Sequence, residues 1–204
     1  MYSFIGIWLL MARVKKLRIK EYWSRGVLLH FRDNSANLGD DSSFKIRKII
    51  DTVRVAFRSA FNPYRKLCVD ESLLLSKGRL SFKQYISSKR SIFGMKTFVL
   101  CDCKIAYVVD FIVYTGTTKE IEVHNLGKSG NIVATLMKPY LELGHTQYVD
   151  NWCTCPSLFL WLHNQRTAAC GTVRRNRIDF PKLQKQLKQG EIEFMSIDAM
   201  LAIK

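Results

Sequence analysis

Apolar residues recur at helical spacing in one early segment of the chain. In IRKIIDTVRVAFRSAF, residues 46–61, the apolar positions fall three or four residues apart, and Asn62 and Pro63 follow directly. This spacing places apolar side chains on one helix face, and proline cannot continue a helix. The pattern therefore predicts an amphipathic helix. Its apolar face consists of Ile46, Ile49, Ile50, Val53, Phe57, Ala60 and Phe61.

Three apolar segments in the middle of the chain have the composition of β-strands. They are KLCVDESLLL at 66–75, MKTFVLCD at 95–102 and IAYVVDFIVYTG at 105–116, with a polar, basic stretch at 76–91 between the first two. Val, Ile, Phe and Tyr favour strands, and Gly116 closes the third segment. The simplest prediction is a meander of three strands.

Helical spacing returns in NIVATLMKPYLELG, residues 131–144. We expect Pro139 to kink this helix and Gly144 to end it. HTQYVD at 145–150 is short and strand-like, PSLFLWLHNQ at 156–165 is typical of a helix with proline in its first turn, and TAACGTVR at 167–174 supplies a fifth strand.

The order of these elements is three strands, a helix, a strand, a helix and a strand. It predicts an α/β layer architecture with a mixed sheet. After Pro181 the chain is polar and rich in lysine, and it ends in GEIEFMSIDAMLAIK. The last apolar run has no closing signal, so we interpret it as an element that is begun and not finished.

The first twenty residues, MYSFIGIWLLMARVKKLRIK, contain an apolar run that positive charges follow rather than precede. This order is not that of a signal peptide, and about twelve apolar residues are fewer than the roughly twenty that span a bilayer. We expect a buried helix here and no membrane segment. The 204 residues are enough for one domain, or for a domain plus a fragment.

The charge is strongly positive, with 32 Lys and Arg against 17 Asp and Glu, a net charge of +15. Basic residues concentrate in segments 12–32, 77–104 and 166–188, whereas 105–150 holds more carboxylates than lysines. Such an excess favours a polyanionic partner, and basic surfaces around an acidic centre suit a metal site flanked by phosphate backbone. A solvated face explains any single basic run equally well.

Six cysteines occur, and two of the spacings are Cys-x-Cys. Structural zinc sites use wider spacings and histidines at regular offsets, which this chain lacks, so we expect no zinc and free buried thiols. The cysteines are Cys68, Cys101, Cys103, Cys153, Cys155 and Cys170.

Two aspartates lie in matching contexts. Asp70 interrupts one apolar strand-like run and Asp150 ends another. A buried carboxylate without a partner is costly, and Mg²⁺ is commonly held by one or two carboxylates plus substrate phosphates. Carboxylates from neighbouring strand ends could converge on one ion. Surface aspartates that cap strands or turns are the alternative.

Several segments, in order, resemble the transposase domain of the piggyBac family and its transposable element-derived members. The most specific are the Asp-Glu-Ser of CVDESLLLSKGRLSFKQY with its Lys-Gly-Arg, and the Val-Asp-Asn of YVDNWCTCPSLF with the later GTVRRNR. The matching segments in full are FIGIWLLMARVKKLRIKEYWS, LHFRDN, FNPYRKLCVDESLLLSKGRLSFKQYISSKRSIFGMKTFVLCD, DFIVYTG, YVDNWCTCPSLF, TAACGTVRRNRIDFPK and LKQGEIEF.

The resemblance implies an RNase H-like core, a mixed five-stranded sheet with flanking helices, in which three aspartates hold two Mg²⁺ or Mn²⁺ ions for DNA cleavage and strand transfer. Asp70 matches the first aspartate and Asp150 the second. The basic residues at family-like positions for DNA backbone are Lys77, Arg79, Lys83, Lys89, Lys96, Arg174 and Arg177.

No residue matches the third aspartate, which in the family lies beyond an insertion after the GTVR strand. We therefore expect an N-terminal helical part at 1–64, an incomplete catalytic core at 65–180, and the truncated start of the insertion domain at 181–204. A site that lacks one ligand of two ions predicts no cleavage by this chain. The alternatives are a DNA-binding protein without catalysis, acting through its basic surfaces, and a fragment that folds poorly.

The resemblance also implies DNA as the partner, a homodimer, and a nuclear location. Cys153 and Cys155 stand where the family has aromatic and serine residues, so they indicate a copy that has diverged rather than a site.

Overall fold

The computed structural model describes residues 42–44, 46–75, 81–86, 93–116, 120–183 and 185–204. The chain divides into two compact units, Met1–Ala56 and Phe57–Lys204. The helix predicted in the first twenty residues and the basic segment 12–32 lie outside the described residues. Among the residues that are described, no helix is long and apolar enough to cross a membrane.

The predicted amphipathic helix is confirmed as α3 (Arg47–Ala60), and the division between the units falls within it. Its last turn belongs to the second unit. There the Phe57 ring meets Tyr107 and Phe111 edge-on, at centroid distances of 6.2 and 6.0 Å. Arg58 lies 3.8 Å from the buried carboxylate of Asp110, which gives that carboxylate a counter-charge.

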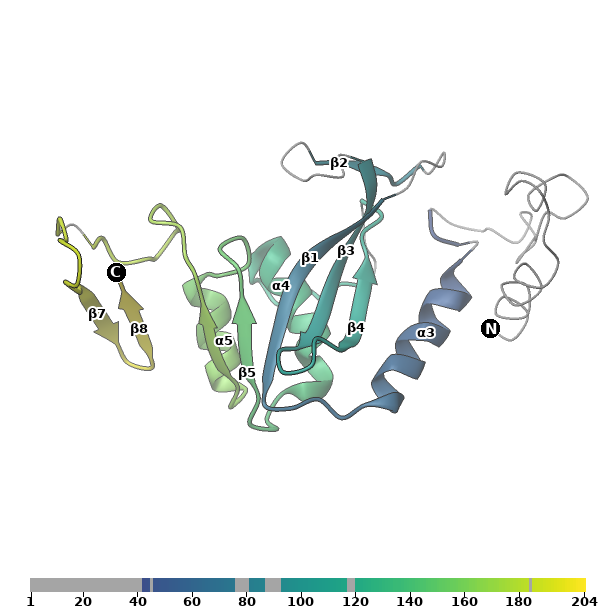
Figure 1. Ribbon diagram of the computed structural model, residues 1–204, viewed down its shortest axis with the longest axis horizontal. Coiled ribbons are helices and arrows are strands. Elements are labelled where there is room, and N and C mark those ends of the chain that lie inside the picture. The colour runs from purple at the N-terminus through teal and green to yellow at the C-terminus, as the bar shows by residue number, and fades with distance from the viewer. Residues whose placement is uncertain (1–41, 45, 76–80, 87–92, 117–119, 184) are drawn as a thin grey trace, which may run out of the picture. The chain divides into compact units, whose positions relative to one another are not determined.

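The second unit is built on a mixed sheet (Figure 1). Its strands are β1 (Lys66–Leu75), β2 (Gln84–Tyr85), β3 (Phe93–Asp102), β4 (Val108–Val113), β5 (Thr146–Val149) and β6 (Ala168–Gly171). β1, β3 and β4 are antiparallel neighbours, so the meander is confirmed, and β5 and β6 continue from β1 in parallel. The five main strands thus run in the order β4, β3, β1, β5, β6. The additional strand β2, only two residues long, pairs with the start of β3.

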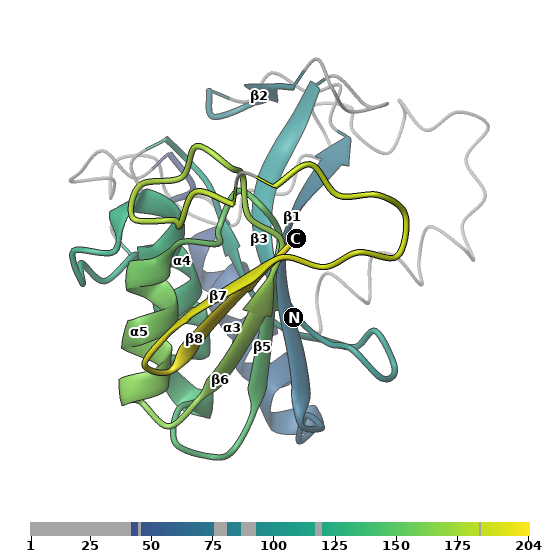
Figure 2. The same cartoon turned by 90° about the vertical axis from the view of Figure 1, so that its left-hand side faces the viewer.

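Two helices, α4 (Gly127–Met137) and α5 (Pro156–Asn164), lie together on one face of the sheet (Figure 2). They enclose one apolar core with the inward residues of the strands. The fully buried members include Leu67, Leu100 and Ile112 from the sheet, and Leu136 and Leu158 from the helices. Alternation along β1 and β3 explains this arrangement, because every second side chain faces the helices.

Pro139 has a stronger effect than the predicted kink. The α-helix ends at Met137, and Pro139 lies in a short 3₁₀ turn, η2 (Lys138–Tyr140). Proline has no N–H for an α-helical hydrogen bond, so the tighter turn replaces the helix. Gly144 lies beyond this turn with φ of +77°, a conformation that glycine adopts without strain.

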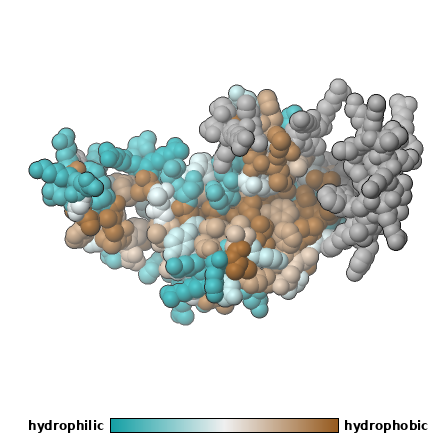
Figure 3. Space-filling model, in the orientation of Figure 1, coloured by the Kyte–Doolittle hydropathy of each residue, from teal (hydrophilic) through white to brown (hydrophobic). Residues whose placement is uncertain are grey.

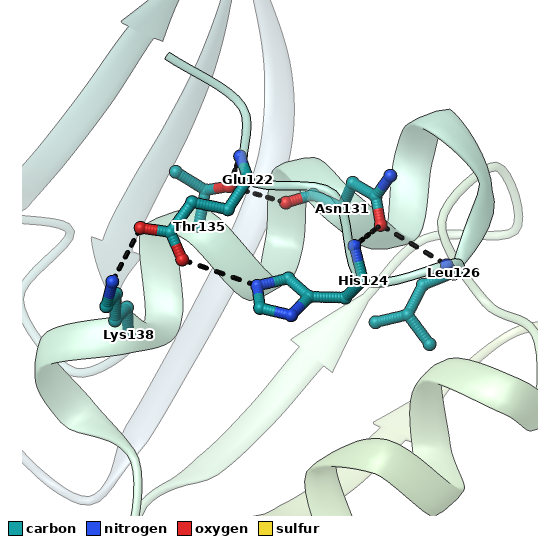
Figure 4. A network of polar contacts seen from close by, with 6 residues as sticks. All are labelled: Glu122, His124, Leu126, Asn131, Thr135 and Lys138. Carbon is teal, nitrogen blue, oxygen red and sulfur yellow. Dashed lines mark hydrogen bonds and ion pairs between the residues drawn. The ribbon is translucent and has the colours of Figure 1, made fainter.

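A polar network joins the segment before α4 to the helix (Figure 4). The Asn131 side-chain oxygen accepts the backbone N–H groups of His124 and Leu126, at 3.1 and 3.2 Å, and Thr135 Oγ1 accepts the N–H of Glu122 at 3.0 Å. Lys138 lies 2.6 Å from the Glu122 carboxylate, and this contact is the main reason that the pKa of Glu122 is lowered. The network fixes the entry into α4.

The end of the chain differs from the prediction. We expected an unfinished element, but β7 (Phe194–Ile197) and β8 (Met200–Ile203) close into an antiparallel hairpin. Asp198, with φ of 44°, makes the tight turn between them. The hairpin exposes apolar side chains, seen as brown surface at the left of Figure 3; Phe194, Ile197 and Ile203 are each more than 60% exposed.

Candidate active site

The two aspartates lie side by side where the parallel pairing of β1 with β5 stops. Val69 of β1 is the register partner of Val149 of β5, and Asp70 and Asp150 are the residues that follow them. β5 ends at Val149, whereas β1 continues to Leu75, so Asp70 lies in the middle of its strand, next to the end of β5. In the described part of the chain, neither carboxylate has an ion-pair partner.

The structure corrects one premise of the sequence argument. The apolar context of Asp70 and Asp150 suggested buried carboxylates, whereas both residues are exposed. Asp70 lies on the sheet face opposite to the one that the core side chains Leu67 and Val69 occupy, and Asp150 lies in the turn after β5. The case for a cation site therefore rests on the convergence of two negative charges rather than on the cost of burial.

Asp150 is held in a tight turn by its own neighbours. Its Oδ1 accepts the backbone N–H groups of Trp152 and Cys153, at 3.1 and 3.2 Å. Its backbone oxygen accepts the N–H and the hydroxyl of Thr154, at 3.0 and 2.8 Å. These bonds fix the carboxylate before α5 begins at Pro156, so little further ordering is needed for it to bind a ligand. The Asp70 carboxylate, by comparison, accepts the N–H of Glu71 at 2.7 Å.

The pKa of the Cys153 thiol is affected by the carboxylates around the Asp150 turn. Burial is the main reason that its pKa rises to about 12, and the charge of Asp150, a hydrogen bond to Asp150, and the charges of Asp70 and Glu71 raise it further. The thiol is therefore neutral near pH 7, and it is neither a nucleophile nor a metal ligand as it stands.

Gly171, the glycine of the GTVR motif, leaves room for the Asp150 turn. A Cβ atom there would lie 2.6 Å from the Val149 carbonyl oxygen and 3.0 Å from Val149 Cγ2, and it would also meet Thr154 Oγ1. No side chain fits between β6 and the turn. The Gly171 backbone therefore lies directly against Val149 and the Thr154 side chain, which requires glycine.

A cation and two aromatic rings brace the turn from the side of β3. The Trp152 ring stacks on Phe98, with centroids 5.5 Å apart and planes 5° apart. Lys96 Nζ lies 4.9 Å from the Trp152 centroid and 2.6 Å from the Glu71 carboxylate. Lys96 is one of the predicted DNA-binding residues, but only 17% of its side chain is exposed.

Two arginines that we predicted to bind DNA also contact the turn. Arg174 Nε donates to the Asn151 side-chain oxygen at 3.2 Å. Arg177 donates from one terminal nitrogen to the backbone oxygens of Asn151 and Trp152, at 2.5 and 3.0 Å. Arg177 thus spans the segment directly after Asp150 and satisfies two of its carbonyl groups.

Of the other predicted DNA-binding residues, the structure describes only Lys83. Lys83 lies over the exposed Phe93 ring, 5.3 Å from its centroid. Lys77, Arg79 and Lys89 lie outside the described residues.

The described residues fit a divalent cation in part. Two neighbouring carboxylates provide the hard oxygen ligands that Mg²⁺ and Mn²⁺ prefer. Within the described ranges, however, no group of three or more His, Cys, Asp or Glu residues could hold a metal ion. The remaining ligands would have to be water or phosphate oxygens, or a group outside this set.

Sequence reasoning missed the residues that hold Asp150 in place. Thr154 acts through a hydrogen bond within the turn. Asn151 and Trp152 act through contacts with Arg174 and Phe98 outside it, and Gly171 acts by leaving space. The GTVR motif was the available signal, because a glycine at a strand end indicates a close backbone approach. What it approaches could not be read from the sequence.

A family model described as Transposase IS4 matches residues 27–203. A cryo-EM structure described as a piggyBac transposase synaptic complex with hairpin DNA has a similar fold, with a TM-score of 0.76 at 23% sequence identity. The match covers 96% of this chain and 46% of that chain, so this chain spans about half the length of that transposase. The likeness confirms the predicted RNase H-like fold.

Proposed function

The chain belongs to the Transposase IS4 family, and on that premise we propose that its piggyBac-type core binds DNA and holds a divalent cation between Asp70 and Asp150. The observation that carries this proposal is the register of β1 and β5, which places Asp70 next to Asp150 where the pairing stops; in the described part of the chain neither carboxylate has an ion-pair partner.

In this proposal the protein groups have separate tasks. Asp150 is the pre-positioned ligand, because backbone N–H groups and Thr154 fix its turn. Asp70 is the facing ligand on the central strand β1. A divalent ion, when bound, supplies Lewis-acid stabilisation of charge on phosphate oxygens. The carboxylates therefore act as ligands rather than as general acids or bases.

We further propose that this chain binds the cation weakly and does not cleave DNA by itself. Two-metal displacement needs two ions about 3.5–4 Å apart, and two carboxylates give few ligands for a pair of ions. The described residues contribute no third acidic group to the site. The net charge of +15 and the DNA named in the structural neighbour support binding to the phosphate backbone.

A labelled transposon-end duplex tests the DNA binding and the lack of cleavage. We expect the full chain to retard the duplex with an affinity that falls steeply as salt rises, and to produce no nick with Mg²⁺ or Mn²⁺. Specific nicking that disappears in Asp70→Ala would show that the chain is an active nuclease, and it would contradict the proposal that the chain does not cleave DNA by itself.

The second candidate function is DNA binding without any metal. The exposed basic residues favour it, and it predicts a DNA affinity that is indifferent to Mn²⁺ and to the charge of Asp70. Binding of Mn²⁺ that depends on both aspartates would exclude it.

A further inference from the structure

Three of the six cysteines gather on one part of the sheet. Cys68 lies on β1, Cys101 on β3, and Cys103 follows the end of β3. The expectation of buried thiols is wrong for this group, because Cys68 and Cys101 are only partly buried and Cys103 is exposed. None of the three belongs to the apolar core cluster, whereas Cys153 does. Packing therefore does not explain them.

The strand register brings the thiols of this group together. Cys68 and Cys101 are direct partners across the antiparallel pair β1 and β3. All three are free thiols. Directly opposite side chains of an antiparallel pair have Cβ atoms about 4.5–5.5 Å apart, so the Cys68 and Cys101 thiols need only a small movement to form a bond.

Backbone hydrogen bonds indicate the spacing of the pair. Cys103 N–H donates to the Lys66 oxygen at 3.0 Å, which makes Lys66 and Cys103 a hydrogen-bonded pair in this register. Such pairs alternate, so Cys68 and Cys101 form the next hydrogen-bonded pair, with Cα atoms about 5.5 Å apart. Disulfides span Cα separations of about 4.4–6.8 Å. The diagonal from Cys68 to Cys103 is about 7–8 Å, which is too long without backbone movement.

We propose that Cys68 and Cys101 are a thiol-oxidation site, which a small-molecule disulfide such as oxidised glutathione converts into a cross-strand disulfide. The thiolate of one of the two attacks the glutathione disulfide and releases one glutathione, and the thiol of the other then displaces the second glutathione. Two protein thiols lose their protons and two electrons, and one oxidised glutathione becomes two reduced ones. The crosslink forms on the strand that carries Asp70, two residues away.

Metal binding is the competing explanation of a thiol cluster. Within the described ranges, no group of three or more His, Cys, Asp or Glu residues has a geometry that could hold a metal ion. A pair of thiols in direct register is sufficient for a disulfide but provides only two soft ligands. The geometry therefore favours oxidation.

The test uses the full reduced chain, incubated with oxidised glutathione, alkylated, and analysed by intact mass and peptide mapping. We expect Cys68 and Cys101 to be lost together as one intramolecular crosslink without a retained glutathione, while the buried Cys153 stays reduced. Cys68→Ser and Cys101→Ser should abolish the crosslink. Cys103→Ser, at the exposed neighbouring cysteine, and Cys170→Ser, at an exposed cysteine on β6, should both leave it unchanged.

Two results would overturn the proposal. In one, Cys68 and Cys101 remain alkylated or carry separate glutathione adducts under conditions that modify Cys170. In the other, a crosslink survives in Cys68→Ser. Circular dichroism melts of each variant, compared with the parent, exclude misfolding as the cause, and the untreated parent chain can be mapped independently of any variant.

Discussion

Replacement of Gly171 by alanine tests how closely the end of β6 packs against the Asp150 turn. The new Cβ would lie 2.6 Å from the Val149 oxygen, and it would press on Thr154 Oγ1, the hydroxyl that donates to the Asp150 backbone oxygen. Gly171 does not have a positive φ, so its backbone conformation suits alanine and the cost comes from space alone.

The expected change in the free energy of unfolding combines two opposing effects. Overpacking of a close contact costs about 1–3 kcal/mol. The loss of chain entropy in the unfolded state returns about 0.4–1 kcal/mol when glycine becomes alanine. We therefore expect Gly171→Ala to lower the free energy of unfolding by roughly 1–2 kcal/mol, and to weaken Mn²⁺ binding because Asp150 moves with its turn.

Urea denaturation followed by tryptophan fluorescence measures the first effect, as a lower midpoint with an unchanged slope. Cys170→Ala is the matched control, because it alters the neighbouring position on the exposed side of β6. It should change the free energy of unfolding by less than about 0.5 kcal/mol. If Gly171→Ala were as stable as the control and bound Mn²⁺ equally well, the close packing of β6 on the turn would be refuted.

Three further predictions concern the groups around the turn. Arg177→Ala removes two hydrogen bonds to the turn, so we expect a loss of about 1–2 kcal/mol in the free energy of unfolding. Arg175→Ala, at an exposed residue, should reduce only the DNA affinity. Equal stability of the two variants would show that the Arg177 hydrogen bonds do not stabilise the turn. Lys96→Met leaves Glu71 without the Lys96 charge and should lower the free energy of unfolding by about 1 kcal/mol, without altering the dependence of DNA affinity on salt. Lys83→Met should reduce the slope of log affinity against log salt by about one if Lys83 contacts phosphate. A smaller slope in Lys96→Met and an unchanged slope in Lys83→Met would show that Lys96 is a phosphate ligand. The pKa of the Cys153 thiol rises from 9.0 to about 12 on folding, so the unfolded chain loses this proton first. The stability that the protonated thiol contributes is full below pH 9 and is lost as the pH rises towards 12. The free energy of unfolding of the parent chain should therefore fall more steeply over this range than that of Cys153→Ala, and parallel curves would contradict the raised pKa.

Much of the fold could be predicted because the spacing of apolar residues shows which face of a helix or strand is buried. The helix at 46–61, the three-strand meander and the strand, helix, strand succession after Gly144 all appear in the structure. The hairpin β7–β8 was missed because its turn, at Asp198 and Ala199, lacks the glycine that usually marks a two-residue turn, and because its apolar side chains face solvent instead of a core.

The candidate site was predictable only where a residue's own type carries the chemistry. Asp70 and Asp150 could be selected as carboxylates that interrupt or end apolar strand-like runs. The roles of Arg174 and Arg177 could not, because they depend on hydrogen bonds to a turn more than twenty residues earlier in the chain. The pairing of Cys68 with Cys101 likewise depends on strand register, which the sequence does not state.

The most direct test of the account is the binding of Mn²⁺ to the full chain, measured by electron paramagnetic resonance of the free ion. Asp70→Asn and Asp150→Asn should each weaken binding by roughly tenfold or more, and the double variant should be little worse than either one, because both carboxylates would hold the same ion. Asp179→Asn makes the same charge change at an exposed residue whose φ of 62° suits asparagine, and it should leave the affinity unchanged. Equal Mn²⁺ affinity in all four variants and the parent chain would contradict the claim that Asp70 and Asp150 form a cation site.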